Sequence, residues 1–234
     1  MELNADIGEG GPDALLMPYV QRVSIACGGH TGDLSSMRRA LQLAKQHGVL
    51  AGAHPGYPDR THFGRKAMTA TADQITNWVA SQVSALQSVA GAQGMELFHV
   101  KPHGALYHQA AFDQETALGV IAAMKGSPLA LVALAGAPLV GWARAAGLMV
   151  LEEAFADRRY LADGQLSSRN LPGAVIESAQ EAAEQAKAIS LGAPVTALDG
   201  GAVRIKADTL CLHGDGSGAD ERARAVARAL SARR

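Results

Sequence analysis

The chain has 234 residues, and 48% of them are hydrophobic, which is enough apolar material for a large buried core. Its net charge is −1 and its mean hydropathy is +0.03, a balance that argues against nucleic-acid binding. There is no secretory signal and no run of about 18 apolar residues, and Cys27 and Cys211 lie too far apart to suggest a disulfide framework. We therefore expect a soluble cytoplasmic protein that binds a small molecule rather than nucleic acid or membrane.

Strand and helix patterns alternate along the chain. Strand-like runs are predicted at residues 2–7, 22–27, 49–54, 96–101, 129–134, 148–153 and 209–213. Helical spacing of apolar residues is clearest at 34–44 and 75–90, and a final helix is predicted from about Ala219. Capping-box spacing begins helices at Thr71 and Ser178. Strands joined through helices run parallel, because right-handed crossovers return each strand in the same direction.

Polar side chains follow nearly every predicted strand, and their positions favour a closed barrel. In an open doubly wound sheet, only the strands beside the switch point line a site. Here six of the seven runs end in reactive residues, as in a barrel whose strands all deliver side chains to one mouth. We therefore predict a single (β/α) barrel of about seven parallel strands over residues 1–234. Two segments do not follow the alternation of strands and helices, a polar loop at 157–173 and a small excursion at 195–206.

The segment 99–108 is the strongest candidate for a functional site. His99, Lys101 and His103 are two residues apart, so in a strand they share one face. Pro102 ends the strand ladder, and Gly104 permits a sharp turn after it. The segment thus delivers one ammonium group and two imidazoles to the end of a strand.

Carboxylates and histidines follow the first three strands. Asp6 is predicted to point into the barrel, where a carboxylate is costly unless it is paired or used, and Glu9 follows it. His54 ends the third strand. After the second strand, the glycine-rich segment with His30 and Asp33 offers backbone N–H groups to an anion, although Asp33 could equally cap the next helix.

Charged residues near the other strands complete the predicted site. Arg65 lies in a short basic turn that could clamp a carboxylate or phosphate. Glu153, Asp157 and Arg158 surround the end of the sixth strand, either as ligand-binding groups or as an ion-pair network. His213 and Asp215 follow the last strand.

Several of these motifs together resemble the LamB/YcsF family. They are Asn4–Glu9, Ile25–Asp33, Gly52–Asp59, Phe63–Arg65, His99–Tyr107, Glu153–Arg158 and His213–Asp215. The likeness spans nearly the whole chain in the family's order and spacing. It implies a fold similar to the seven-stranded glycoside hydrolase/deacetylase barrels.

The resemblance also implies a reaction, the ATP-dependent opening of the lactam ring of 5-oxo-L-proline to L-glutamate, with ADP and phosphate. It implies that the chain works with two partner subunits, B and C, of a 5-oxoprolinase. In such a reaction Lys101, Arg65 and Arg158 would supply cations for phosphoryl and carboxylate groups. Asp6 or His54 would activate water, and His103 would protonate the departing nitrogen.

No Gly-x-x-x-x-Gly-Lys-Ser/Thr motif is present, so a partner subunit could be the one that binds ATP.

Two other functions remain open from the sequence. One alternative is a metal-dependent deacetylase, because Asp6, His54, His99 and His103 could hold a divalent metal such as zinc. The other is a non-catalytic accessory role in support of a partner hydrolase.

Overall fold

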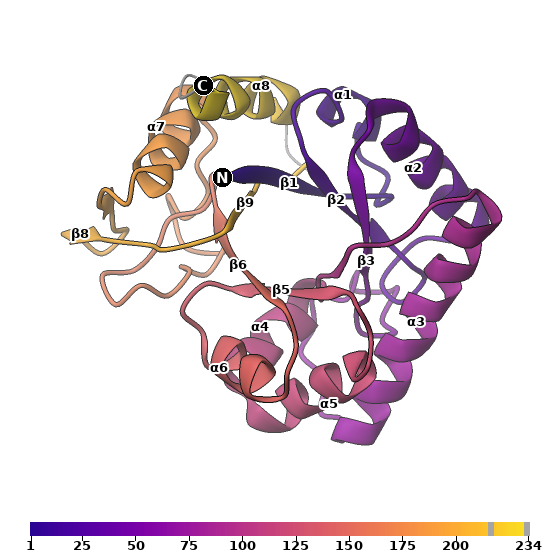
Figure 1. Cartoon of the computed structure of the whole chain (residues 1–234). Coiled ribbons are helices and arrows are strands. Elements are labelled where there is room, and N and C mark those ends of the chain that lie inside the picture. Colours follow the sequence, from indigo (N-terminus) through magenta and orange to yellow (C-terminus); the bar gives the residue numbers. More distant parts are fainter. Residues whose placement is uncertain (215–217, 232–234) are drawn as a thin grey trace.

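The centre of the computed structural model, which describes residues 1–214 and 218–231, is a closed barrel of seven parallel strands (Figure 1). Around the barrel the order is β1-β2-β3-β4-β5-β6-β9. The strands are β1 (Glu2–Ile7), β2 (Arg22–Ala26), β3 (Leu50–His54), β4 (His99–Val100), β5 (Ala130–Leu134), β6 (Val150–Phe155) and β9 (Thr209–Cys211). The prediction of a seven-stranded barrel is confirmed.

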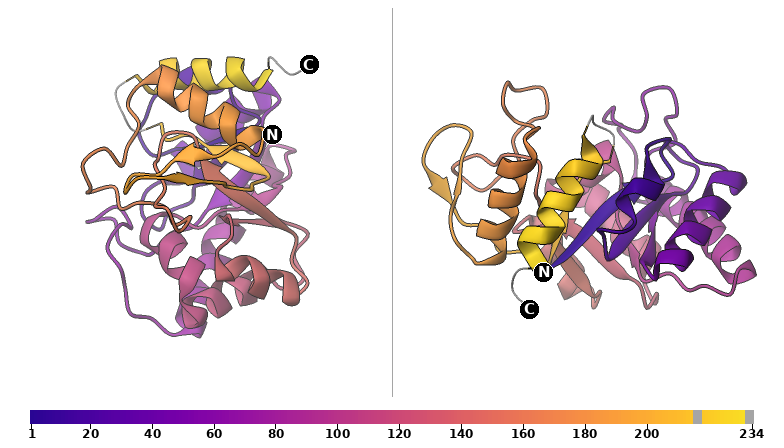
Figure 2. Two further views of the ribbon diagram at one scale, coloured as in Figure 1. Left: turned by 90° about the vertical axis from the view of Figure 1, so that its left-hand side faces the viewer. Right: turned by 90° about the horizontal axis from the view of Figure 1, so that it is seen from above.

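Helices surround the barrel and bury its outer face (Figure 1). They are α1 (Asp13–Leu16), α2 (Leu34–His47), α3 (Ala72–Ala92), α4 (Gly104–Phe112), α5 (Gln114–Met124), α6 (Pro138–Ala145), α7 (Ala179–Ser190) and α8 (Ala219–Ser231). Thr71 and Gln74 form the predicted reciprocal cap of α3, and the Ser178 side chain caps α7. Figure 2 shows α7 and α8 packed side by side near the C-terminus. None of the described helices combines the length and apolar character needed to cross a bilayer.

The barrel closes through its last strand. β9 pairs with β6 on one side and with β1 on the other, so Thr209 faces both Glu153 and Glu2 in register. The predicted excursion before β9 is a two-stranded antiparallel hairpin, β7 (Val195–Thr196) and β8 (Ala202–Val203), which projects from the barrel (Figure 1). β4 is shorter than predicted, although backbone hydrogen bonds extend the ladder from Phe98 to Lys101.

The interior of the barrel is polar, in contrast to the apolar layer between strands and helices. The Asn4 amide donates to the Thr209 hydroxyl at 2.9 Å, and Ser24 Oγ lies 3.2 Å from His99 Nε2. Burial lowers the pKa of His99 to about 3, so its ring is neutral. His99 therefore fills the barrel beneath the mouth, bonded to Ser24, and does not open onto the cavity at the mouth.

Two buried glutamines tie the outer helices to loops at the barrel mouth. Gln82 of α3 accepts from the Gly56 N–H and donates to its carbonyl, which fixes the loop after β3. Gln185 of α7 donates to the carbonyls of Phe155, Ala156 and Arg158, which fixes the chain after β6. These loops carry residues of the site described below, so the helices hold the site as well as the core.

Gly52 makes room for the buried His99 ring, and this gives a first testable expectation. A Cβ at position 52 would lie 2.4 Å from His99 Cδ2 and Nε2, far inside van der Waals contact. Gly52→Ala should therefore destabilise the fold by about 1–3 kcal/mol through overpacking. Gly91→Ala is the control, because nothing lies within 4 Å of its added Cβ and helix propensity favours alanine. Equal melting temperatures for the two variants would contradict this account.

Candidate functional site

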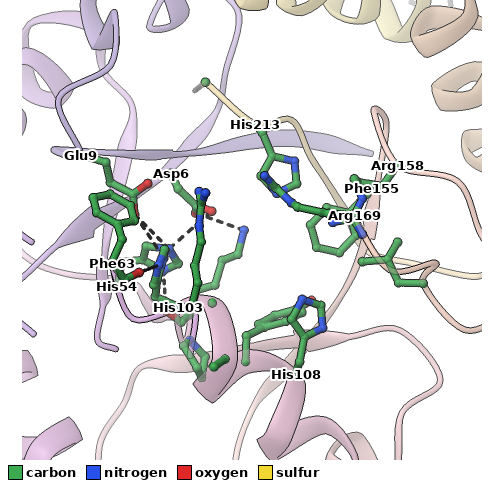
Figure 3. Close-up of a pocket in the computed structure, with 18 of the residues that line it drawn as sticks. Asp6, Glu9, His54, Phe63, His103, His108, Phe155, Arg158, Arg169 and His213 are labelled. Carbon is green, nitrogen blue, oxygen red and sulfur yellow. Dashed lines mark hydrogen bonds and ion pairs between the residues drawn. The ribbon is translucent and has the colours of Figure 1, made fainter. Parts of the chain in front are cut away.

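A cavity of about 570 Å³ opens at the carboxyl ends of the barrel strands (Figure 3). Asp6 of β1, His54 of β3, Lys101 after β4 and His213 after β9 all line it. Strands distant in sequence thus bring their polar ends to one place, as parallel barrel strands must. One side of the cavity holds Asp6, Glu9, His54 and His103, and the opposite side holds Arg158, Arg169 and His213 (Figure 3).

Lys101 lies at the floor of the cavity and pairs with two carboxylates, Asp6, which also lines the cavity, and Glu153, which is buried behind it. Its Nζ lies 3.1 Å from Asp6 Oδ1 and 2.9 Å from Glu153 Oε1, and all three side chains are largely buried. Tyr107 of α4 donates to the second Glu153 oxygen at 2.9 Å. Although burial opposes the charged form, the neighbouring carboxylates and Cys211 raise the pKa of Lys101 well above its ordinary value. Lys101 is therefore an ammonium whose charge is balanced within the protein.

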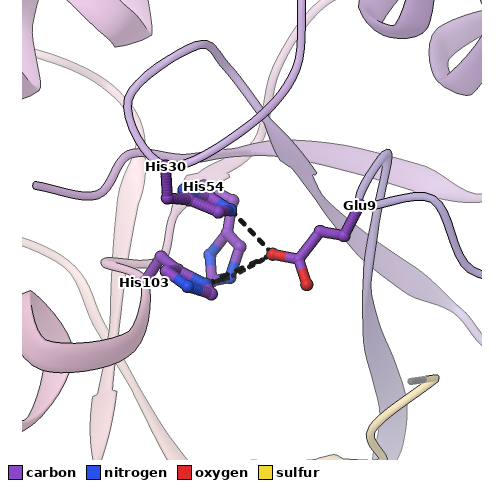
Figure 4. Close-up of side chains that lie close together, drawn as sticks. All are labelled: Glu9, His30, His54 and His103. Carbon is purple, nitrogen blue, oxygen red and sulfur yellow. Dashed lines mark hydrogen bonds and ion pairs between the residues drawn. The ribbon is translucent and has the colours of Figure 1, made fainter. Parts of the chain in front are cut away.

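Next to this floor, four side chains converge to form what we call the histidine cluster, Glu9, His30, His54 and His103 (Figure 4). One potential ligand atom from each lies within 4.8 Å of all the others, and no second group of this kind occurs among the described residues. Glu9 Oε1 is 2.8 Å from His30 Nε2, 3.2 Å from His103 Nδ1 and 3.7 Å from His54 Nε2. His54 Nε2 and His103 Nδ1 are 3.1 Å apart.

Backbone carbonyls hold the histidine rings in place. His54 Nδ1 lies 2.7 Å from the Lys101 carbonyl, and His103 Nε2 lies 2.9 Å from the Phe63 carbonyl. The His30 ring stacks on His103 with centroids 3.5 Å apart. Because a carbonyl only accepts hydrogen bonds, the bonded nitrogen of His54 and of His103 carries the proton. Their other nitrogens face the cluster.

The surroundings of Asp6, Glu9, His30 and His54 make these four side chains weak bases. Burial lowers the pKa of His54 to about 3, and it also lowers the pKa of His30. Burial alone would raise the pKa of Asp6, but His54 and Lys101 outweigh it and bring the value to about 2. For Glu9 the hydrogen bonds from His103 and His30 likewise overcome burial and lower the pKa. Asp6 and Glu9 are thus anionic near neutral pH, and neither Asp6 nor His54 has the pKa near 7 that suits a general base.

The opposite side of the cavity is cationic. Burial and the nearby Arg169 lower the pKa of Arg158 to about 10, so its guanidinium stays charged. Burial and these two arginines also lower the pKa of His108 to about 4. His213 stacks on Phe155 at 5.4 Å. Excess positive charge at a partly buried surface is what an anionic ligand requires.

Asp157 supports this cationic side from behind. Asp157 Oδ2 accepts a hydrogen bond from the backbone N–H of His213 at 2.9 Å. Asp157 Oδ1 lies 3.0 Å from the ring nitrogen Nδ1 of His213. Burial would raise the pKa of Asp157, but His213 lowers it below its ordinary value, so the carboxylate is charged. Asp157 therefore orients the His213 ring and does not itself reach the cavity.

The structure brings together most residues that the sequence singled out. The predicted residues that line the cavity are Asp6, Glu9, His54, Arg65, Lys101, His103, Arg158 and His213. His30, Glu153 and Asp157 are buried directly behind it, each bonded to a lining residue.

Two details of the prediction change. Asp33 does not line the cavity, because its side chain accepts from the Ser36 N–H and caps α2 at an exposed position. The group able to hold a metal contains Glu9 and His30 in place of the predicted Asp6 and His99. Asp6 is drawn to Lys101, and His99 lies deeper in the barrel. Asp215 lies outside the described residues.

Three lining residues, Tyr107, His108 and Arg169, were not among the predicted site residues. Tyr107 stands one helical turn after His103, so the spacing i, i+4 could have indicated that both face the same site. His108 adjoins it, and Arg169 comes from the irregular loop at 157–173. No periodic pattern marks a residue in such a loop, so nothing in the sequence would have placed Arg169 here.

Comparisons with known proteins agree with this architecture. The A subunit of a 5-oxoprolinase from Thermus thermophilus is 45% identical over 98% of this chain and 95% of its own length, and that from Syntrophobacter fumaroxidans is 43% identical over 98% and 94%. A lactam utilization protein from Thermus thermophilus superposes with a TM-score of 0.94 at 44% identity, covering 99% of this chain and 96% of that one.

A mutant of a CE4 family pseudoenzyme shares only the fold, with a TM-score of 0.50 at 8% identity over 99% of this chain and 62% of that one. The profile of the LamB/YcsF family matches residues 1–234, the whole of the sequence. With relatives above 40% identity at nearly full length, the chain belongs to the LamB/YcsF family.

Proposed function

We propose that this chain is the A subunit of a 5-oxoprolinase. In this proposal it opens the lactam ring of 5-oxo-L-proline to L-glutamate, with ATP converted to ADP and phosphate, in a cytoplasmic complex with subunits B and C. The names of the relatives support the assignment, and the sequence motifs agree with it. Because those names designate one component of a larger enzyme, they also support the expectation of partner chains.

The observation that carries the proposal is the division of the cavity into two chemically different sides. The substrate is a small ring with a carboxylate at one position and an amide at another. The cationic side with Arg158 and Arg169 suits the carboxylate, or a phosphoryl group, through charge-assisted hydrogen bonds. The side with His54 and His103 then faces the lactam carbonyl. A cavity of about 570 Å³ exceeds what the ring alone needs and leaves room for a phosphoryl group.

The proposed chemistry has two stages. Transfer of a phosphoryl group to the lactam oxygen removes amide resonance and converts that oxygen into a leaving group. Water then adds to the ring carbon, the carbon–nitrogen bond breaks and the nitrogen takes up a proton, which leaves an acyl phosphate. A second water molecule hydrolyses this acyl phosphate to the carboxylate and inorganic phosphate. Lys101 was predicted to be one of the cations for phosphoryl groups, and in this proposal its paired ammonium instead holds Asp6 and Glu153 in position.

ATP enters this proposal mainly through the partner subunits. The sequence has no P-loop, and the arginines of the cavity are suited to a transferred phosphoryl group rather than to a whole nucleotide. We therefore propose that the nucleotide binds on one of the partner chains or where that partner meets this chain.

The decisive experiment measures glutamate formation from ATP and 5-oxo-L-proline by this chain alone and with subunits B and C. We expect product only with the partners. Deacetylation of acetylated sugars by the chain alone would instead support the deacetylase alternative. Unchanged activity of the complex after replacement of the lining residues His54, Arg158 and His213 together would show that the chain has only an accessory role.

Two neighbouring arginines test the cationic side. Arg158 lines the cavity, whereas Arg159 points outward and pairs with Glu181 at 2.7 Å. Arg158→Gln should raise the KM for 5-oxo-L-proline about 10- to 150-fold, the worth of a charge-assisted hydrogen bond. Arg159→Gln should leave KM within about twofold, since exposed ion pairs contribute little. If both variants have the same KM, the cationic side of the cavity does not bind the substrate.

A further inference from the structure

The histidine cluster has an unusual arrangement of lone pairs. His54 and His103 each donate one ring N–H to a backbone carbonyl, so in the neutral rings His54 Nε2 and His103 Nδ1 present lone pairs. These two atoms face each other at 3.1 Å. Glu9 Oε1 lies 3.2 Å from His103 Nδ1 and 3.7 Å from His54 Nε2. With both rings neutral, three acceptor atoms therefore surround one point.

Such an arrangement is unfavourable unless something positive lies at its centre. A proton on one ring would satisfy only part of these contacts, whereas a divalent cation at the common point would satisfy all of them at once. We propose that Glu9, His54 and His103 bind one Zn²⁺ ion, with His30 as the outer partner that holds the Glu9 carboxylate.

The distances fit this ion. Zinc binds imidazole nitrogen and carboxylate oxygen at about 2.0–2.2 Å in a tetrahedral arrangement, which places its ligand atoms about 3.3–3.5 Å from one another. The three observed separations of 3.1, 3.2 and 3.7 Å lie on either side of that range. Two imidazoles and one carboxylate also match the preference of zinc for mixed nitrogen and oxygen ligands.

His30 has a different place because it is too close to Glu9. Its Nε2 lies 2.8 Å from Glu9 Oε1, which is a hydrogen-bond distance and shorter than the separation of two zinc ligands. The ring stacks on His103 and is fully buried. His30 therefore orients both a carboxylate ligand and an imidazole ligand. The carbonyls of Lys101 and Phe63 do the same for His54 and His103, as outer partners of metal-binding histidines commonly do.

Three protein ligands leave one position on the ion for a water molecule. Glu9, His54 and His103 line the cavity, so that position can face its open space. Zinc in such a site lowers the pKa of its bound water. The proposal is independent of the substrate, because it rests only on the geometry of the ligands.

Two variants remove a ligand atom while keeping the anchor of the same side chain. Asparagine at position 54 has its amide nitrogen where His54 has Nδ1, so His54→Asn retains the donor to the Lys101 carbonyl and loses Nε2. Glutamine at position 103 likewise keeps a donor for the Phe63 carbonyl and loses Nδ1. His62→Gln is the matched control, since the His62 side chain is exposed, pairs with Asp59 and does not belong to the cluster.

The experiment strips the full chain with a chelator and measures zinc uptake by competition with a chromophoric chelator, with metal content counted per chain. We expect one tightly bound Zn²⁺, a higher melting temperature with zinc, and visible absorption of a four-coordinate ion when Co²⁺ replaces it. His54→Asn and His103→Gln should weaken binding by at least about 100-fold, and His30→Gln by about 10- to 100-fold. His62→Gln should bind like the parent.

Melting curves of the zinc-free proteins show whether each variant is folded. A folded parent that takes up no zinc at micromolar concentrations would overturn the proposal, and so would a His54→Asn variant that binds as tightly as the parent. If the parent binds no zinc yet forms glutamate with subunits B and C, only the zinc site is wrong. If it binds zinc but the complex forms no glutamate, only the proposed function is wrong.

Discussion

Lys101→Met is expected to lower the free energy of unfolding by about 3–5 kcal/mol, because removal of one partner from a buried ion pair leaves the other charge uncompensated. Here two carboxylates, Asp6 and Glu153, lose their common counter-ion. Glu153 is fully buried, and burial already raises its pKa, so it would be protonated or unpaired in the variant. For a chain of this size the melting temperature should fall by about 6–20 °C.

A double-mutant cycle tests the cause. Glu153→Gln removes the charge and keeps an oxygen that accepts from Tyr107. If the uncompensated carboxylate is responsible, the pair Lys101→Met and Glu153→Gln should be more stable than Lys101→Met alone, with an interaction energy of about 0.5–3 kcal/mol. Chemical denaturation measures all four proteins. Additive effects, or a Lys101→Met variant that melts like the parent, would show that the lysine is not the centre of a buried network.

His54→Asn is expected to reduce glutamate formation by the reconstituted complex by about 10²–10⁴-fold, with little change in melting temperature. The structure holds His54 by its Nδ1 and points Nε2 into the cavity. The variant retains the first interaction and deletes the second. Its low pKa makes His54 a poor general base, so the loss is expected from removal of the ligand atom Nε2. Loss of a metal ligand should cost more than the roughly 10- to 100-fold in activity that loss of an outer partner costs.

The assay compares the kcat of the variant with that of the parent. Subunits B and C are in excess, so that weaker assembly of the complex is not mistaken for a slower reaction. His62→Gln, on the surface, should retain the activity of the parent. If His54→Asn keeps activity within about threefold while it remains folded, His54 has only a structural role at the end of β3.

Much of the barrel could be predicted because strand and helix periodicities are local. Each strand was placed within a few residues, and the helix that begins after Thr71 followed from its cap. The concentration of polar residues at strand ends also indicated the closed barrel. Once the strands are parallel and the sheet is closed, their carboxyl ends must meet, so the presence of Asp6, His54, Lys101 and His213 in one cavity follows from topology.

The details of pairing could not be predicted, because they depend on distances between segments far apart in sequence. Nothing local shows that Lys101 finds its counter-ions inside the protein, since Glu153 is 52 residues away and on another strand. The sequence also offered His99 and His103 as equivalent residues of one strand face. The structure separates them, because His99 lies below the mouth and His103 immediately precedes α4. The sequence was compatible with Asp33 either as a ligand-binding residue or as a helix cap. In the structure its side chain caps α2.

The position of β9 bears on how the protein is synthesised. β9 closes the barrel between β1 and β6, and only after it has formed can His213 join the residues contributed by β1 and β3. A nascent chain that has emerged only through β6 would expose the open edges of β1 and β6 and would lack one wall of the cavity. Contacts between segments about 200 residues apart also form slowly. Completion of the site is therefore one of the last events in folding, and an unfinished chain has edges that favour capture by chaperones or by other nascent copies.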